Sequence, residues 1–201
     1  MPTVTRYHPV LVVLHWILAF MITAALALGA LVMVHLPSNA PMKYEALRSH
    51  MIGGVLILVL MGLRFTIRQL TAIPAPAPTG NGLLDRLAKL SHRGFYSLVL
   101  AQVITGLVMA FQAHLPQILL FGHGTLPATF WTFPTRLPHY LISRMLMTLI
   151  AIHVAGALYH TFIRRDRLLR RMWFGKRLVP AGEQSLAQAQ PTLQVSSCTR
   201  F

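Results

Sequence analysis

The stretch that decides the fold is HYLISRMLMTLIAIHVAGALYHTFI, residues 139–163. It is apolar along its whole length apart from three histidines, one arginine and a few hydroxyl side chains. A helix of this length, rising about 1.5 Å per residue, crosses a hydrocarbon core of about 30 Å. The stretch therefore predicts a transmembrane helix that carries ionisable side chains.

Three more apolar stretches have the length of a membrane span. They lie near residues 10–34, 48–70 and 92–113 and end at Pro-containing segments, because proline does not continue a helix. The sequence thus predicts an all-α membrane protein, a four-transmembrane-helix bundle filling residues 1–180. We expect the apolar, Gly- and Pro-containing loop 114–138 to lie along the membrane interface, and residues 181–201 to form a disordered cytoplasmic tail.

Composition supports a membrane protein and argues against other classes. The 201 residues are 55% hydrophobic and 11% charged, against about 25% charged in a soluble domain. Eighteen Lys and Arg against four Asp and Glu give a net charge of +14, which in an apolar chain indicates contact with anionic lipid rather than nucleic acid. The single Cys198 excludes a disulfide framework and covalent haem attachment through a cysteine pair.

The distribution of basic residues predicts the orientation. By the positive-inside rule, the side richer in Lys and Arg is cytoplasmic, so both termini are expected there. The first and third helices then run outward, and the second and fourth run inward. The basic residues on the predicted cytoplasmic side are Arg6, Arg64, Arg68, Arg86, Lys89, Arg93, Arg164, Arg165, Arg167, Arg170, Arg171, Lys176 and Arg177, whereas the outer side has Lys43, Arg48, Arg136 and Arg144.

Histidines in the fourth helix share one face. At 100° per residue, the 14 residues from His139 to His153 return to within about 40° of the starting direction, and the 7 residues from His153 to His160 return to within about 20°. His139 and His153 are roughly 21 Å apart along the axis, and His160 falls at the cytoplasmic boundary. His139 and His153 therefore lie at two depths that other helices can match.

The other helices supply a histidine at each depth. His50 is level with His139 on the outer side, and His15 is level with His153 on the inner side. Two opposed histidine pairs in an apolar bundle predict two axially ligated, non-covalent haems b. His92 is an alternative inner ligand in place of His15 or His153. We expect His8, His35, His114 and His123 to be solvated or interfacial.

A zinc or copper site and a haem-free transporter are the alternatives to a haem protein. A zinc or copper site needs ligands within a few ångströms of each other, whereas these pairs are split across the membrane. A haem-free transporter with histidine relays would be colourless when purified.

Small and basic residues lie at positions that suit haem. Gly53 and Gly54 follow His50 by one helical turn, where missing side chains would let a flat macrocycle approach. Arg64 is 14 residues past His50 on the same face and is expected either to pair with a carboxylate of the inner haem or to anchor the helix. Arg48 and Arg144 are candidates for the same role at the outer haem.

With these residues in place, the chain resembles the bacterial cytochrome b561 family, in particular its small di-haem four-helix type. The resemblance covers residues 6–173. It is carried by Leu14-His15-Trp16, by Ser49-His50-Met51-Ile52-Gly53-Gly54 through Arg64 and Arg68, by Ser91-His92 and Thr105-Gly106-Leu107-Val108-Met109, and by His139, Ile152-His153 through His160 and Asp166. Where the family commonly has Glu after the outer fourth-helix histidine, this chain has Tyr140.

The resemblance implies a multi-pass protein of the bacterial inner membrane with the ligand pairs His15–His153 and His50–His139. It implies superoxide as electron donor at the outer face and ubiquinone as acceptor near the inner haem. On that basis Arg136, with Arg48 and Arg144, is expected to steer superoxide, and His92 and His160 to contact the quinone. The competing hypothesis is a membrane-anchor subunit that relays electrons between a hydrogenase or dehydrogenase partner and the quinone pool.

Overall fold

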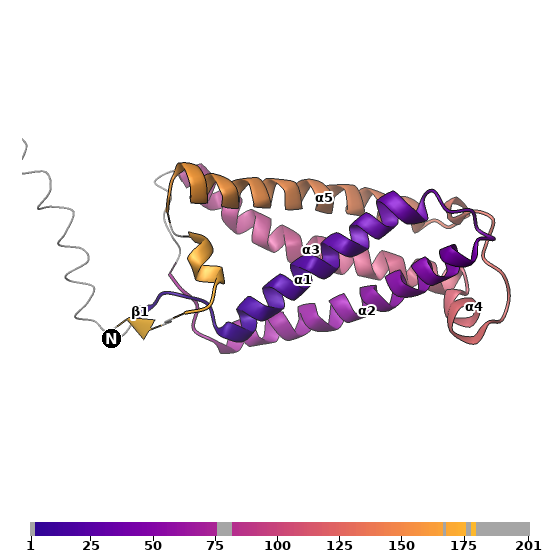
Figure 1. The fold of residues 1–201 in the computed structure, drawn as a ribbon, viewed down its shortest axis with the longest axis horizontal. Coiled ribbons are helices and arrows are strands. Elements are labelled where there is room, and N and C mark those ends of the chain that lie inside the picture. The colour runs from indigo at the N-terminus through magenta and orange to yellow at the C-terminus, as the bar shows by residue number, and fades with distance from the viewer. Residues whose placement is uncertain (1–2, 76–81, 167, 176–177, 180–201) are drawn as a thin grey trace, which may run out of the picture.

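The computed structural model describes residues 3–75, 82–166, 168–175 and 178–179, and its body is an up-and-down bundle of four long helices (Figure 1). The bundle consists of α1 (Pro9–Ala27), α2 (Pro41–Leu70), α3 (Gly82–Gln112) and α5 (Arg136–Leu158). α1 continues as the π-helical η1 (Leu28–Met33), and α5 continues as the π-helical η3 (Tyr159–Ile163). All four are long and apolar enough to span a membrane, which confirms the predicted fold class.

Two helices begin earlier than the sequence predicted. α2 begins at Pro41, a residue suited to the first turn of a helix because it has no N–H group to leave unpaired, so the helix extends outside the apolar stretch 48–70. α3 begins at Gly82, although its apolar part, Leu90–Gln112, agrees with the predicted span. Both extensions contain charged residues, Lys43 and Glu45 in α2 and Asp85, Arg86 and Lys89 in α3, so mean hydropathy does not mark them as part of a span.

The two ends of the described chain meet at one end of the bundle. β1 (Thr3–Val4) pairs antiparallel with β2 (Leu178–Val179), a short ladder that the sequence did not predict. Nearby, the 3-10 helix η4 (Leu168–Met172) packs against α1, where the Trp16 side chain donates a 3.0 Å hydrogen bond to the Met172 carbonyl. The connector residues 76–81, the tail 181–201, Arg167, Lys176, Arg177 and Cys198 lie outside the described residues.

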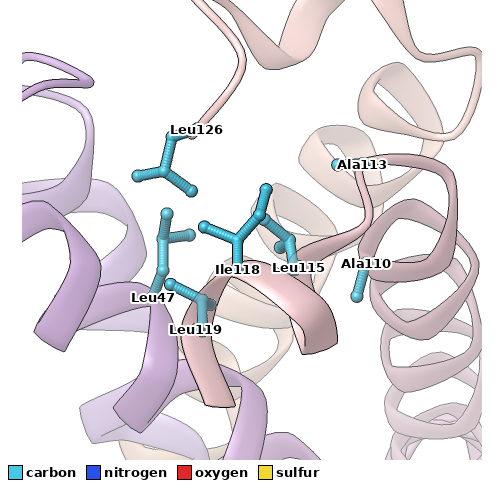
Figure 2. Close-up of a cluster of buried hydrophobic side chains, with 7 residues drawn as sticks. All are labelled: Leu47, Ala110, Ala113, Leu115, Ile118, Leu119 and Leu126. Atoms are coloured by element: carbon cyan, nitrogen blue, oxygen red, sulfur yellow. The ribbon is translucent and has the colours of Figure 1, made fainter. Parts of the chain in front are cut away.

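At the opposite end, the loop 114–138 folds back onto the bundle. It contains α4 (Leu115–Phe121) and the 3-10 helix η2 (Phe130–Thr132). Figure 2 shows the buried cluster that joins the loop to α2 and α3: Leu47, Ala110, Ala113, Leu115, Ile118, Leu119 and Leu126. The apolar residues of the loop thus divide between a cap on the bundle and exposed side chains such as Phe121, whereas the sequence predicted only an interfacial segment.

A second buried cluster fills the middle of the bundle. It consists of Leu18, Ile57, Val99, Val103 and Leu146. Leu146 is halfway in sequence between His139 and His153, and Ile57 is halfway between His50 and Arg64. This apolar layer therefore separates an outer and an inner group of polar side chains.

Candidate functional site

The outer group is built around His50 of α2 and His139 of α5. Their ring centroids are 6.3 Å apart and the ring planes are 76° apart. A metal–imidazole bond is about 2 Å long, which places the centres of two rings on one metal roughly 6 Å apart. The separation of this pair matches that distance.

His139 is held against α3 by hydrogen bonds. Its Nδ1 lies 3.1 Å from the carbonyl oxygen of Gln102, and its Nε2 lies 3.0 Å from the side-chain amide nitrogen of Gln102. Both contacts are satisfied when Nδ1 carries the proton and Nε2 has the lone pair. Histidine ligands of metals commonly have one ring nitrogen on a backbone carbonyl, as Nδ1 of His139 has here. Its Nε2 accepts from the Gln102 amide in this structure, so coordination through Nε2 requires that amide to move aside.

Gly106 allows the ring of His139 to pack closely against α3. A Cβ atom on Gly106 would lie 3.0 Å from Cε1 of His139, which is tighter than most packing contacts, whereas one on Gly29 would meet Cε1 of His50 at an ordinary 3.9 Å. Gly53 and Gly54 face open space, with no atom within 4 Å of an added Cβ. Both positions are partly buried and carry no side chain, so the helix surface near His50 is open to a flat group there.

The Nδ1 atom of His50 is buried and makes no hydrogen bond of normal geometry within the described part of the chain, although it lies near the backbone of Ala25. A buried polar atom without a partner is uncommon and indicates a missing ligand or a strained site.

The inner group contains three histidines. The ring of His153 is 5.9 Å from that of His92 and 5.3 Å from that of Phe95. His15 lies close enough to His153, His92 and Arg64 to interact with them electrostatically. The structure therefore brings His15 and His153 into one region, as expected, and includes His92 in it.

Arg64 is buried beside this inner group, with 8% of its surface exposed. Its guanidinium donates a hydrogen bond to the hydroxyl of Tyr96 and lies over the Tyr96 ring. No carboxylate among the side chains that the structure describes forms an ion pair with Arg64. An arginine buried in a membrane bundle without an acidic partner favours an anionic ligand, because an uncompensated charge there is costly.

The predicted outer cations take different positions. Arg136 is partly buried one turn before His139 and stacks on the ring of Trp131. Lys43 is buried, and its Nζ donates to the backbone carbonyls of Met33 and Leu36 at the end of η1. Arg48 and Arg144 are exposed, and neither guanidinium forms an ion pair with another described side chain.

His160 lies in η3 at the inner end of α5. Its Nδ1 is 2.7 Å from Oδ2 of Asp166, which also lies 3.7 Å from Nε of Arg164. The second carboxylate oxygen, Oδ1, is buried without a hydrogen-bond partner within the described residues. His160 is therefore polarised by a carboxylate rather than solvated alone.

Sequence reasoning missed the partners of the histidines and of Arg64. Gln102, Thr105 and Tyr96 all lie on α3 and contact His139 or Arg64. Their signal in the sequence was their polarity inside an apolar span, which marks candidates for function.

A family comparison agrees with this arrangement. The family model for prokaryotic cytochrome b561 matches residues 6–175. The chain belongs to the prokaryotic cytochrome b561 family. As a cytochrome b561 it is a multi-pass protein of the bacterial inner membrane and a member of a haem b-binding family.

Two curated relatives are similar to this cytochrome b561 over nearly their whole length. "Cytochrome b561 homolog 2" of Escherichia coli (strain K12) is 27% identical over 175 residues, which are 85% of this chain and 92% of the relative. "Probable superoxide oxidase CybB" of Yersinia pestis is 26% identical over 178 residues, which are 86% of this chain and 98% of the relative.

The residues present fit haem. The unpartnered Nδ1 of His50, the open space at Gly53 and Gly54, and the buried Arg64 without an acid each suit a flat, anionic, metal-bearing group.

Proposed function

We propose that this cytochrome b561 binds two haems b, oxidises superoxide at the periplasmic face and reduces ubiquinone. The observation that carries the proposal is the presence of two separate histidine groups, at the outer and inner ends of the bundle, with an apolar layer between them. The similarity to a relative named as a probable superoxide oxidase supports the choice of donor.

On this proposal His50 and His139 would hold the outer haem iron as its ligands, and His15 and His153 would hold the inner one. With two histidines on each iron, the haems would exchange electrons with substrate without binding it at the metal. The 5.9 Å approach of His92 to His153 supports keeping His92 as the alternative partner of His153. The hydrogen bond from Nδ1 of His139 to the Gln102 carbonyl would leave the lone pair on Nε2, which would coordinate in place of its present hydrogen bond from the Gln102 amide.

When bound, the haems supply reversible one-electron carriers at the two depths. In the overall reaction two superoxide anions lose one electron each and become dioxygen, while ubiquinone gains two electrons and two protons and becomes ubiquinol. The proposed role of Arg136, Arg48 and Arg144 is to attract superoxide, since basic surfaces raise the arrival rate of small anions. Arg64 would bind a haem propionate.

The proposed quinone contacts are His160 and His92 at the inner end. Nδ1 of His160 lies 2.7 Å from Oδ2 of Asp166, and the imidazolium form of His160, with its charge facing that carboxylate, would donate a hydrogen bond to a quinone oxygen from its other nitrogen. Its position at the end of the span allows the apolar tail of the quinone to stay in lipid.

The test begins with the purified protein. We expect a low-spin b-type spectrum with two haems per chain, rapid reduction by superoxide, and ubiquinol formation in proteoliposomes. His50→Ala should lower the content to about one haem per chain, whereas His35→Ala, at the exposed outer end of the first span, should retain two.

Other results would contradict the proposal. A colourless protein would favour the haem-free transporter. A red protein that superoxide does not reduce, and that copurifies with a large soluble redox subunit, would favour the membrane-anchor hypothesis. Unchanged quinone reduction in both His92→Ala and His160→Ala would exclude the proposed quinone contacts.

A further inference from the structure

Three side chains stack at the outer end of α5. The guanidinium carbon of Arg136 lies 4.8 Å from the centre of the Trp131 ring, within the range of a cation–π contact. The ring of Tyr140 also meets Trp131, edge to face, with the ring centroids 5.8 Å apart. Arg136 and Tyr140 are four residues apart and therefore neighbours on one helix face, so Trp131 contacts both.

The backbone around Trp131 is fixed by local hydrogen bonds. The Thr129 hydroxyl accepts from the Trp131 N–H at 3.3 Å and caps the 3-10 helix that carries the ring. The Arg136 N–H bonds to the Phe133 carbonyl at 3.0 Å, which joins this turn to the first turn of α5. Trp131 is 57% exposed, and its ring is positioned by this backbone turn together with its contacts to Arg136 and Tyr140.

A second cation lies near the stack. Lys43 lies close enough to Arg136 for the two positive charges to repel each other, and Arg136 lies close enough to His139 to disfavour a positive charge on its ring. Neither Lys43 nor Arg136 forms an ion pair with a carboxylate among the described side chains. Two neighbouring cations without an acid produce a positive potential that attracts an anion.

We propose that Trp131 is a positioning residue that holds Arg136, next to Lys43, as the capture point for a small anionic electron donor one helical turn outside His139. This inference rests on the proposed function for the identity of the donor as superoxide. Without the ring, the long arginine side chain would sample many rotamers, and its charge would spread over the surface. The stack concentrates the charge beside the outer histidine pair.

The test compares Trp131→Leu, Trp131→Phe and Trp131→Tyr with the parent protein, each with both haems loaded. Haem reduction is followed by stopped flow, with superoxide and ascorbate as anionic donors and a neutral quinol as reference, from low to high KCl. In Trp131→Leu we expect the second-order rate with both anions to fall roughly three- to tenfold at low salt and the salt dependence to flatten. The tyrosine variant, which keeps a cation–π face, should recover most of the rate, and the phenylalanine variant part of it.

The control is Phe121→Leu, which removes an exposed aromatic side chain from the same outer loop. It should leave rates and salt dependence unchanged. If Trp131→Leu lowers only the stability in the membrane, or lowers the anionic and neutral donor rates equally, Trp131 is an interfacial anchor and the inference is wrong. If superoxide does not reduce even the parent protein but the ascorbate rate responds to Trp131→Leu as expected, the capture point stands and the proposed donor is wrong.

Discussion

At the scale of single residues, Gly106 decides how closely the ring of His139 can approach α3. Even the Cβ of an alanine would lie 3.0 Å from the ring, and the branched side chain of Gly106→Val would have to displace it. We expect this variant to lose the outer haem and to fall from two haems to about one per chain. Pyridine haemochrome analysis per mole of protein measures the change.

Gly62→Val is the matched control, because Gly62 lies on an exposed face of α2 with no atom within 4 Å of an added Cβ. Its haem content should equal that of the parent protein. Equal losses in both variants would mean that valine harms the helices generally and that Gly106 has no special relation to His139.

A second prediction at this scale concerns Arg64 and the midpoint potential of the inner haem. If its charge faces an anionic group of the inner haem, Arg64→Met removes a positive charge and stabilises the oxidised form. At about 10 Å and an effective dielectric of about 20, one charge contributes roughly 1–2 kcal/mol, so the inner midpoint potential should fall by several tens of millivolts. Redox titration measures this value, with Arg68→Met, one turn further along α2, as the control.

The grouping of the histidines into two levels was predictable from spacing. The interval from His139 to His153 predicts two levels, and the structure has His50 beside His139 and His15 near His153. Which residues of α3 face the histidines was not predictable, because the rotation of a helix about its axis depends on packing. Gln102 and Tyr96 therefore emerged only from the structure.

At the scale of elements, α4 seals the outer end of the bundle. Leu119 is 8% exposed within the cluster of Figure 2, whereas its neighbour Leu120 is 46% exposed. Leu119→Ala should destabilise the folded protein by about 2–4 kcal/mol through cavity formation, and Leu120→Ala by much less. Unfolding by denaturant in detergent measures the difference, and equal effects would show that α4 is not packed as described.

Hydropathy predicted the apolar parts of the helices but not their polar extensions. α2 begins at Pro41 and α3 at Gly82, both outside the apolar stretches. Apolar composition reports contact with lipid, whereas helix boundaries depend on capping and proline geometry. The sequence did not predict the cap formed by α4 for a related reason. The same apolar residue types are found in buried segments and in segments at the membrane interface.

At the scale of the whole molecule, the orientation is testable. An alkaline phosphatase inserted at Gly124 should be active because the positive-inside rule places the loop in the periplasm, whereas a phosphatase fused at the C-terminus should be inactive. A cytoplasmic fluorescent reporter at the C-terminus should show the complementary result. If the phosphatase were active only at the C-terminus, the orientation would be reversed, and the sites called outer and inner would exchange sides of the membrane.

The bundle is also divided in a way that bears on its biogenesis. α1 packs mainly on α2, and α3 on α5, and the two hairpins meet through α2 and α3 and through the central buried cluster. The first hairpin contributes His15 and His50, and the second contributes His139 and His153. With the proposed ligand pairs, neither hairpin alone coordinates a haem on both sides, so cofactor loading must follow insertion of the fourth span by the translocon. Each haem would then crosslink the two hairpins through one histidine from each. When haem is scarce, the hairpins should associate more weakly and be degraded faster by membrane proteases.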